Sequence, residues 1–215
     1  MNVPSILMIF DFDNTLIDSK INFIELRGAL IDLWASAAPL PDTRDALLRL
    51  PIRDIVDQAV AASRGLTEAA WAVIEAYETS GLDGAPAMPD ALAVLESLAA
   101  RGIRLALLTN NARPATLRLL ESLGLARLFD LTITRSDASA LKPDPAGVHL
   151  ILDRLGPTGA VYLVGDSWID GLAAEAAGVR FIGVGPRRAE VEARGVRPWA
   201  WIDDLRSLLD LDLGP

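Results

Sequence analysis

The stretch ILMIFDFDNTLIDS (Ile6–Ser19) passes directly from an apolar run into two carboxylates. Its first five residues, Ile6–Phe10, form the continuous hydrophobic run that is typical of a buried parallel strand. Asp11 and Asp13 follow, separated by one phenylalanine. Because uncompensated charge at the end of a buried strand is costly, these carboxylates require a stabilising partner. The stretch therefore predicts a cation next to the end of the first strand.

Short apolar runs alternate with helical patterns along most of the chain. This alternation is typical of a parallel α/β sheet whose strands are connected through helices. The tail WAWIDDLRSLLDL predicts a last short strand followed by a closing helix. We expect a doubly wound, Rossmann-like parallel sheet. Its longer strands are predicted at Ile6–Phe10, Ile103–Leu108, Leu131–Thr134, Val161–Val164 and Phe181–Val184.

One segment near the N-terminus contains helical patterns and no good strand pattern. It includes INFIELRGALIDLWASA and TEAAWAVIEAYETS. The stretch GLDGAP (Gly81–Pro86) then predicts a hinge that leads back to the sheet. We expect an inserted all-helical cap domain over residues 19–81, with residues 1–18 and 82–215 forming the α/β core.

Composition limits the classes of function and of site. The 215 residues are 51% hydrophobic and carry a formal net charge of −9, which argues against broad binding of nucleic acid or adhesion to anionic membranes. The chain has no cysteine, so disulfides, thiolate nucleophiles and cysteine-based metal sites are excluded. His149 is the only histidine, which argues against a two-histidine metal site. The chemistry must come mainly from carboxylates, hydroxyls, lysine and arginine.

The N-terminal stretch and the lengths of the apolar runs indicate where in the cell we expect the protein. The N-terminal MNVPSILMIF lacks the basic region and the small-residue cleavage site of a signal peptide. No apolar run approaches the length of a membrane span. The lack of cysteine fits a reducing compartment, and we expect a cytoplasmic protein.

Polar residues follow four of the predicted strands at the point where each strand ends. Because ligands bind beyond the carboxyl ends of parallel strands, these side chains should converge on one crevice. Clustered carboxylates form an oxygen-rich site suited to Mg²⁺, and a hydroxyl and an ammonium would complete a cradle for phosphoryl oxygens. In chain order the residues are Asp11 and Asp13, Thr109–Asn111, Lys142 of RSDASALKPDP, and Asp166 with Asp170 of GDSWID.

Lys142 is distinguished by its residue type. Only two lysines, Lys20 and Lys142, are present among the 20 basic residues of the chain. Where arginine is the usual cation, a lysine at a strand end indicates that a compact point charge is required there.

Two stretches have simpler structural interpretations. GDSWID also fits the N-terminus of a helix capped by Asp166 or Ser167. GVGPRR (Gly183–Arg188) is rich in glycine but lacks the full spacing of a nucleotide-binding loop, and we assign it no such role.

With four motifs in this order, the chain resembles the haloacid dehalogenase (HAD) superfamily. The resemblance covers essentially the whole chain, and the helical insert is similar to the cap of phosphoglycolate phosphatase-like members. Asn14 stands where glycine is commoner in close relatives. The matching residues are DFDNT (Asp11–Thr15) for the first motif, Asp-x-Asp-x-Thr; Thr109 for the second; Lys142 of LKPDP for the third; and Asp166 with Asp170 for the fourth.

The resemblance implies a Mg²⁺-dependent phosphatase and a role for each matching residue. Asp11 would be the nucleophile that forms an aspartyl-phosphate, and Asp13 would be the general acid and then the general base. Haloacid dehalogenases proper lack an acid at the position of Asp13, so phosphate chemistry is favoured. Thr109, Lys142 and the backbone N–H of Asn110 would bind the phosphoryl group. The implied Mg²⁺ ligands are the Asp11 carboxylate, the Asp13 backbone carbonyl and Asp166, with Asp170 as a further ligand or beside them.

The implied substrate is a small phosphorylated metabolite of the phosphoglycolate or sugar phosphate type, with the cap closing to exclude bulk water. A β-phosphoglucomutase-like phosphomutase uses the same motifs, and a requirement for a sugar bisphosphate would indicate it. A non-catalytic phospho-ligand-binding protein of the same fold would bind tightly without turnover. We expect no nucleic-acid or membrane partner, and a monomer or a homodimer.

Overall fold

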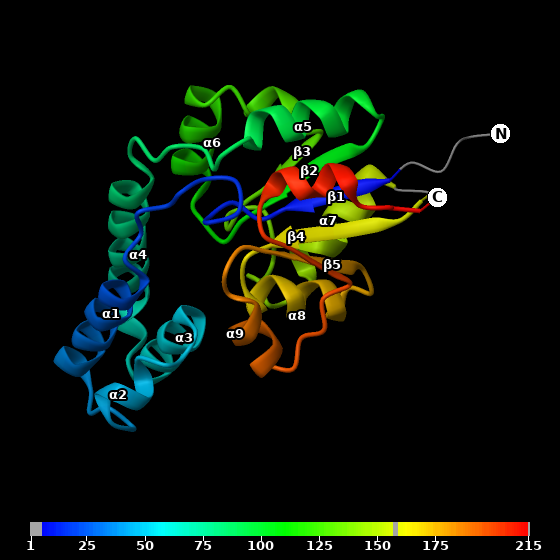
Figure 1. The fold of residues 1–215 in the computed structure, drawn as a ribbon. Coiled ribbons are helices and arrows are strands. Elements are labelled where there is room, and N and C mark those ends of the chain that lie inside the picture. Colours follow the sequence, from blue (N-terminus) through cyan, green and yellow to red (C-terminus); the bar gives the residue numbers. More distant parts are fainter. Residues whose placement is uncertain (1–5, 157–158, 215) are drawn as a thin grey trace. The chain divides into compact units, whose positions relative to one another are not determined.

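The computed structural model describes residues 6–156 and 159–214, which contain a six-stranded parallel sheet. The strand order is β3-β2-β1-β4-β5-β6 (Figure 1). The chain first builds outward from β1 to β3 and then returns to build from β4 to β6, so the predicted doubly wound sheet is confirmed. The strands are β1 (Leu7–Phe10), β2 (Arg104–Leu108), β3 (Leu131–Ile133), β4 (Val161–Gly165), β5 (Arg180–Val184) and β6 (Ala200–Ile202).

Helices cover both faces of this sheet. Leu7 and Ile9 of β1 belong to a buried cluster that also contains residues of α7 (Ala146–Leu155), α8 (Trp168–Ala176) and α9 (Arg188–Ala193). On the opposite face, α5 and the 3₁₀ helix η3 pack against each other (Figure 1). Because both faces are covered, all four residues of β1 are buried and apolar. The remaining elements of this unit are α5 (Ala91–Ala100), α6 (Arg113–Ser122), η2 (Ala126–Leu128) and η3 (Leu205–Asp210).

The chain divides into two compact units, one formed by Met1–Ser19 with Gly84–Pro215 and the other by Lys20–Asp83. The second unit contains helices and no strand over its fully described length. It has a buried apolar cluster of its own, to which Trp34 and Ile55 contribute. Its elements are α1 (Phe23–Ala37), α2 (Arg44–Leu47), α3 (Ile52–Ala62), η1 (Arg64–Leu66) and α4 (Thr67–Leu82).

Several helices end at glycines. Gly102 follows α5 with a φ of +78°, and Gly124 follows α6 with a φ of +69°. Glycine adopts this left-handed conformation without a steric penalty, which explains its role as a helix stop. The longest helix, α4, has 16 residues. Among the described residues, no helix combines the length and the apolar character that crossing a membrane requires.

The register of the strands brings their carboxyl ends together. Phe10 of β1 pairs with Leu107 of β2 and with Val164 of β4. Because the strands are parallel, the residues that follow them emerge at one edge of the sheet. The residues at this edge are Asp11, Thr109 and Asp166.

The indole ring of Trp201 in β6 lies against Gly183 of β5, where a side chain would otherwise be. Gly183 pairs with Trp201 across the two strands, and a Cβ at Gly183 would lie 2.1 Å from Cε3 and Cζ3 of the indole ring. The ring is held by its own N–H, which donates to the carbonyl of Gly185 at 2.8 Å. This edge of the sheet therefore requires a residue without a side chain at position 183.

We expect Gly183→Ala to lower the free energy of unfolding by about 1–3 kcal/mol, because the added methyl group overlaps the ring. Trp201→Ala removes packing but makes room for that methyl group. The double variant should therefore lose less stability than the sum of the two single variants. Urea denaturation of all three variants measures the difference, and strictly additive losses would contradict the steric explanation.

Candidate active site

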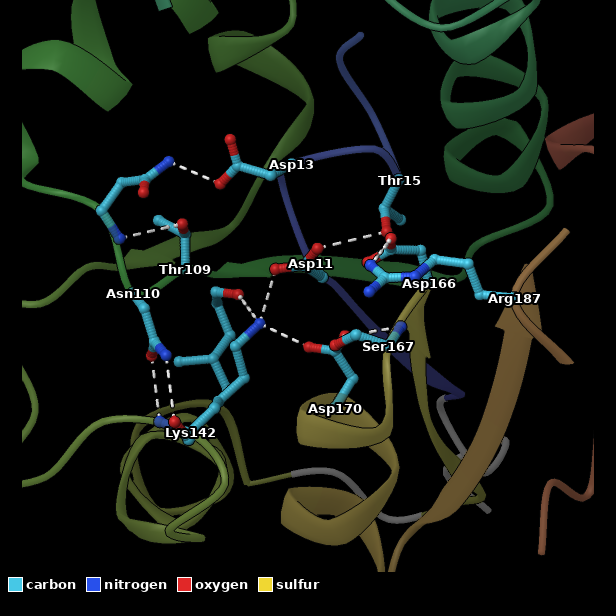
Figure 2. A network of polar contacts seen from close by, with 12 residues as sticks. Asp11, Asp13, Thr15, Thr109, Asn110, Lys142, Asp166, Ser167, Asp170 and Arg187 are labelled. Atoms are coloured by element: carbon cyan, nitrogen blue, oxygen red, sulfur yellow. Dashed lines mark hydrogen bonds and ion pairs between the residues drawn. The ribbon is translucent and has the colours of Figure 1, made fainter. Parts of the chain in front are cut away.

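All the predicted site residues lie beyond the carboxyl ends of the strands (Figure 2). The structure brings Asp11, Lys142, Asp166 and Asp170 into one buried cluster, with Thr109 buried at the end of β2. The segments that carry the predicted residues are the ends of β1 (Asp11, Asp13), β2 (Thr109, Asn110) and β4 (Asp166), the first turn of α8 (Asp170), and the connection from β3 to α7 (Lys142).

The ammonium group of Lys142 is the centre of the cluster. Its Nζ donates to Oδ1 of Asp11 at 2.5 Å, to Oδ1 of Asp170 at 2.6 Å and to the carbonyl of Leu108 at 2.9 Å. These three contacts match the three donors of an ammonium. Burial alone would lower the pKa of Lys142, but the charges of Asp11 and Asp170 outweigh it and raise that pKa. The lysine is therefore charged at neutral pH.

Asp11 has a partner at each carboxylate oxygen. Oδ1 accepts from Lys142, and Oδ2 accepts from the hydroxyl of Thr15 at 3.2 Å. Burial raises the pKa of Asp11 well above its usual value, and the charge of Asp170 raises it further, while Lys142 lowers it. The net increase shows that burial, together with the neighbouring carboxylates, outweighs the effect of the ammonium on this pKa.

Asp13 interacts with the side chains of Asn111 and Ser19, and one of its oxygens has no hydrogen-bond partner among the described residues. Its Oδ2 accepts from the amide Nδ2 of Asn111 at 2.6 Å, whereas Oδ1 is buried and accepts no hydrogen bond from the described residues. Burial raises the pKa of Asp13, and the Ser19 and Asn111 side chains oppose this in part. A carboxyl group with a raised pKa is suited to donating and accepting a proton near neutral pH.

The side chain of Asn110 joins two loops of the site. Its Nδ2 donates to the backbone carbonyl of Lys142 at 3.0 Å, and its Oδ1 accepts from the backbone N–H of Lys142 at 2.9 Å. Figure 2 shows these two parallel bonds. The amide therefore fixes the backbone that carries the ammonium. The prediction that the backbone N–H of Asn110 binds phosphate stays a prediction.

Asp170 is oriented from the start of α8. Its Oδ2 accepts from the hydroxyl of Ser167 at 2.6 Å and from the backbone N–H of Ser167 at 3.2 Å. A Cβ at Gly165 would lie only 2.5 Å from Cγ of Asp170, so the glycine makes room for this carboxylate. GDSWID thus acts as a helix cap and also directs Asp170 to Lys142.

The carboxylates fit a hard divalent cation. Asp11, Asp166 and Asp170 each offer an oxygen, and these oxygens lie within 4.8 Å of one another. All three residues are buried. The pKa of Asp166 is raised to about 6, first by burial and then by the charge of Asp170, while Arg187 opposes the increase. Oxygen donors with excess negative charge are the environment that Mg²⁺ prefers.

Two contacting residues, Thr15 and Arg187, were not predicted from the sequence as site residues, whereas Asn111 was expected at this edge of the sheet without a role of its own. Thr15 and Asn111 hold Asp11 and Asp13, and Arg187 donates from Nη1 to Oδ2 of Asp166 at 3.0 Å. Thr15 lies in DFDNT and Asn111 lies in TNN, both of which the sequence analysis singled out. Their positions could therefore have indicated that they contact the site. Arg187 lies three residues beyond β5, within the GVGPRR stretch to which no role was assigned.

Asn14 has a left-handed backbone, with a φ of +56°. Its backbone N–H donates to the carbonyl of Ile17 at 2.8 Å in the turn that follows the two aspartates. Glycine and asparagine adopt this conformation more readily than other residues. The asparagine at this position is therefore compatible with the turn.

Comparisons with known proteins agree on one family. Residues 8–184 match the model of the haloacid dehalogenase-like hydrolase family. A phosphoglycolate phosphatase from Yersinia pseudotuberculosis is 33% identical over 192 residues, covering 81% of this chain and 78% of that protein. A solved structure named as a haloacid dehalogenase-like hydrolase, from Bacteroides fragilis, aligns with a TM-score of 0.69 and 26% identity over 94% of this chain and 98% of that one. One named as a β-phosphoglucomutase, from Thermotoga maritima, shares the fold, with a TM-score of 0.63 and 22% identity over 95% and 96% of the two chains.

We expect Asn14→Gly to keep the stability of the wild type and Asn14→Ala to lower the free energy of unfolding by about 1–2 kcal/mol. The alanine Cβ is strained in a left-handed backbone, whereas glycine has no such group. Chemical denaturation of both variants checks this. Equal stabilities for the alanine and glycine variants would contradict the assigned backbone conformation.

In the presence of EDTA, we expect the free energy of unfolding to fall as the pH rises from about 4 to above 6. The folded-state pKa of Asp166, about 6, exceeds the ordinary value of 3.8, so the folded state binds the proton more tightly and is stabilised below this window. Asp166→Asn cannot titrate, and its stability should fall less over the same range, by up to about 3 kcal/mol. Denaturation curves at several pH values test this, and identical slopes for the two proteins would refute it.

Proposed function

The chain belongs to the haloacid dehalogenase-like hydrolase family and is a phosphatase, and we propose that it hydrolyses a small phosphomonoester with Mg²⁺ through an aspartyl-phosphate. The observation that supports this most directly is the buried contact of Lys142 with Asp11 and Asp170. It combines a carboxylate nucleophile, a fixed cation and further carboxylates at one sheet edge.

In the first step, a carboxylate oxygen of Asp11 attacks the phosphorus atom, and the bond from phosphorus to the ester oxygen breaks. Asp13 donates a proton to the departing oxygen, so the alcohol leaves as a neutral molecule. Thr109, Lys142 and the backbone N–H of Asn110 would bind the phosphoryl oxygens whose charge must be stabilised. The raised pKa of Asp13 supports its role as the acid.

In the second step, Asp13, now a carboxylate, accepts a proton from a water molecule that attacks the aspartyl-phosphate. The bond from phosphorus to Asp11 breaks, inorganic phosphate leaves, and the free carboxylate is restored. The buried Oδ1 of Asp13, which accepts no hydrogen bond from the described residues, is a suitable site for this proton. Asn111 holds the other oxygen and keeps the group in place.

The carboxylates of Asp11, Asp166 and Asp170 would hold Mg²⁺, together with the backbone carbonyl of Asp13. When bound, the ion supplies positive charge that orients the phosphoryl group and offsets its negative charge. Thr15 and Ser167 orient two of these carboxylates through their hydroxyl groups. Such supporting hydrogen bonds usually tune a metal site.

The substrate class is a small phosphate ester, with phosphoglycolate as the first candidate because a relative that is 33% identical is named as a phosphoglycolate phosphatase. We assign selection among such esters to residues of the helical unit Lys20–Asp83. A family resemblance supports this assignment, since the inserted helices correspond to the cap of phosphoglycolate phosphatase-like members.

We expect Mg²⁺-dependent release of phosphate from phosphoglycolate or another small ester, and a fall to background in EDTA. Asp11→Asn should lower kcat by on the order of a thousandfold or more, because the amide is a poor nucleophile. The control is Asp153→Asn, which removes the same charge from an exposed position of α7. The assay measures phosphate from a panel of phosphoglycolate, sugar phosphates and nucleoside monophosphates.

A different experimental outcome would contradict each part of the proposal. Wild-type turnover by Asp11→Asn would refute the nucleophile, and equal release in EDTA would refute the metal. Transfer to a sugar hydroxyl that requires a sugar bisphosphate would indicate a phosphomutase. Tight binding of the esters without turnover would indicate a binding protein.

A further inference from the structure

Arg187 connects the candidate metal site to the surface of the core. It lies between β5 and α9, and its Nη1 donates to Oδ2 of Asp166 at 3.0 Å. The side chain of Asp166 is 9% exposed, whereas that of Arg187 is 43% exposed. Figure 2 shows the guanidinium beside the Asp166 carboxylate. The contact therefore joins a solvated cation to a buried carboxylate.

The guanidinium also has a second anionic partner. Its Nε and Nη2 donate to the two carboxylate oxygens of Glu190, at 3.0 and 3.3 Å. Glu190 is half-exposed and lies outside the metal-binding group. Arg187 would therefore keep an ion pair if it released Asp166.

Lys142 and Arg187 each pair with different carboxylates of the candidate metal group. Lys142 contacts Asp11 and Asp170, and Arg187 contacts Asp166. Each of the three carboxylates thus has a positively charged partner within hydrogen-bond distance. A divalent ion bound to the same carboxylates would be repelled by a guanidinium that remained on Asp166.

We propose that Arg187 is an internal counter-ion for Asp166 that competes with Mg²⁺, stabilising the metal-free core and weakening metal binding. This inference rests on the proposed metal-dependent function. It differs from a positioning role, in which loss of Arg187 would misplace Asp166 and weaken metal binding. The two roles predict changes of metal affinity in opposite directions.

The test is calorimetric titration of Mg²⁺, and of Mn²⁺ as a second probe, into wild type and Arg187→Gln. The measurement is made at about pH 8, above the pKa of about 6 that Asp166 has. We expect the variant to bind both ions more tightly, by on the order of tenfold. In EDTA, the same variant should unfold at a lower urea concentration than the wild type.

The control is Arg188→Gln, which removes the same charge one residue away. Arg188 pairs with Glu192 at 2.8 Å and contacts none of the metal-binding carboxylates. Its metal affinity should change by less than about twofold, since exposed charges are well screened. A similar gain in both variants would assign the effect to net charge and overturn the competition.

A second pair of variants tests the competition independently of Arg187→Gln. Glu190→Gln removes the alternative anionic partner, so Arg187 should hold Asp166 more firmly and metal binding should weaken. Glu192→Gln is its matched control and should bind metal like the wild type. Tighter binding by Glu190→Gln would overturn the proposal.

The wild-type titration separates failure of this inference from failure of the proposed function. If the wild type binds neither ion, both the metal site and the competition are refuted. If the wild type binds Mg²⁺ but Arg187→Gln binds it equally or more weakly, only the competition is refuted. Arg187 would then act as a structural or positioning residue.

Discussion

The site depends on one requirement, that carboxylates buried together have positive charge beside them. Asp11 and Asp170 are both buried, and Lys142 lies between them with all three of its donors used. Removing one partner from a buried ion pair leaves an uncompensated charge, which is far more costly than losing a surface pair. The contact of Lys142 with the carbonyl of Leu108 also ties this charge centre to the end of β2.

Strands position the chemical groups of the site, and side-chain contacts in the loops orient them. The parallel register brings the ends of β1, β2 and β4 to one edge. Asn111 then orients Asp13, and Ser167 orients Asp170. A site whose groups are held before substrate arrives avoids reorganisation during the reaction, which is a major source of catalytic power.

The fold and the convergence of the candidate site residues at one sheet edge were predictable because they follow from strong local patterns. Continuous apolar runs marked the buried strands, and parallel geometry then required the polar residues after them, such as Asp11 and Asp166, to meet. The partner of Asn110 was not predictable, because a side chain that binds a backbone leaves no residue signature in the partner. Arg187 was also missed, since arginine is the usual cation of this chain and only the path of its loop brings it to Asp166.

The pairing of Asn110 has a consequence for how this protein can diverge. The amide of Asn110 recognises the peptide group at position 142 and not the lysine side chain. The two hydrogen bonds that Asn110 makes to the backbone of position 142 therefore do not depend on the side chain there. The path of the backbone at this position and the charge of its side chain therefore depend on different contacts. A descendant could lose the ammonium, and with it the charge at the centre of the site, while retaining the shape of the loop as a scaffold for recognition alone.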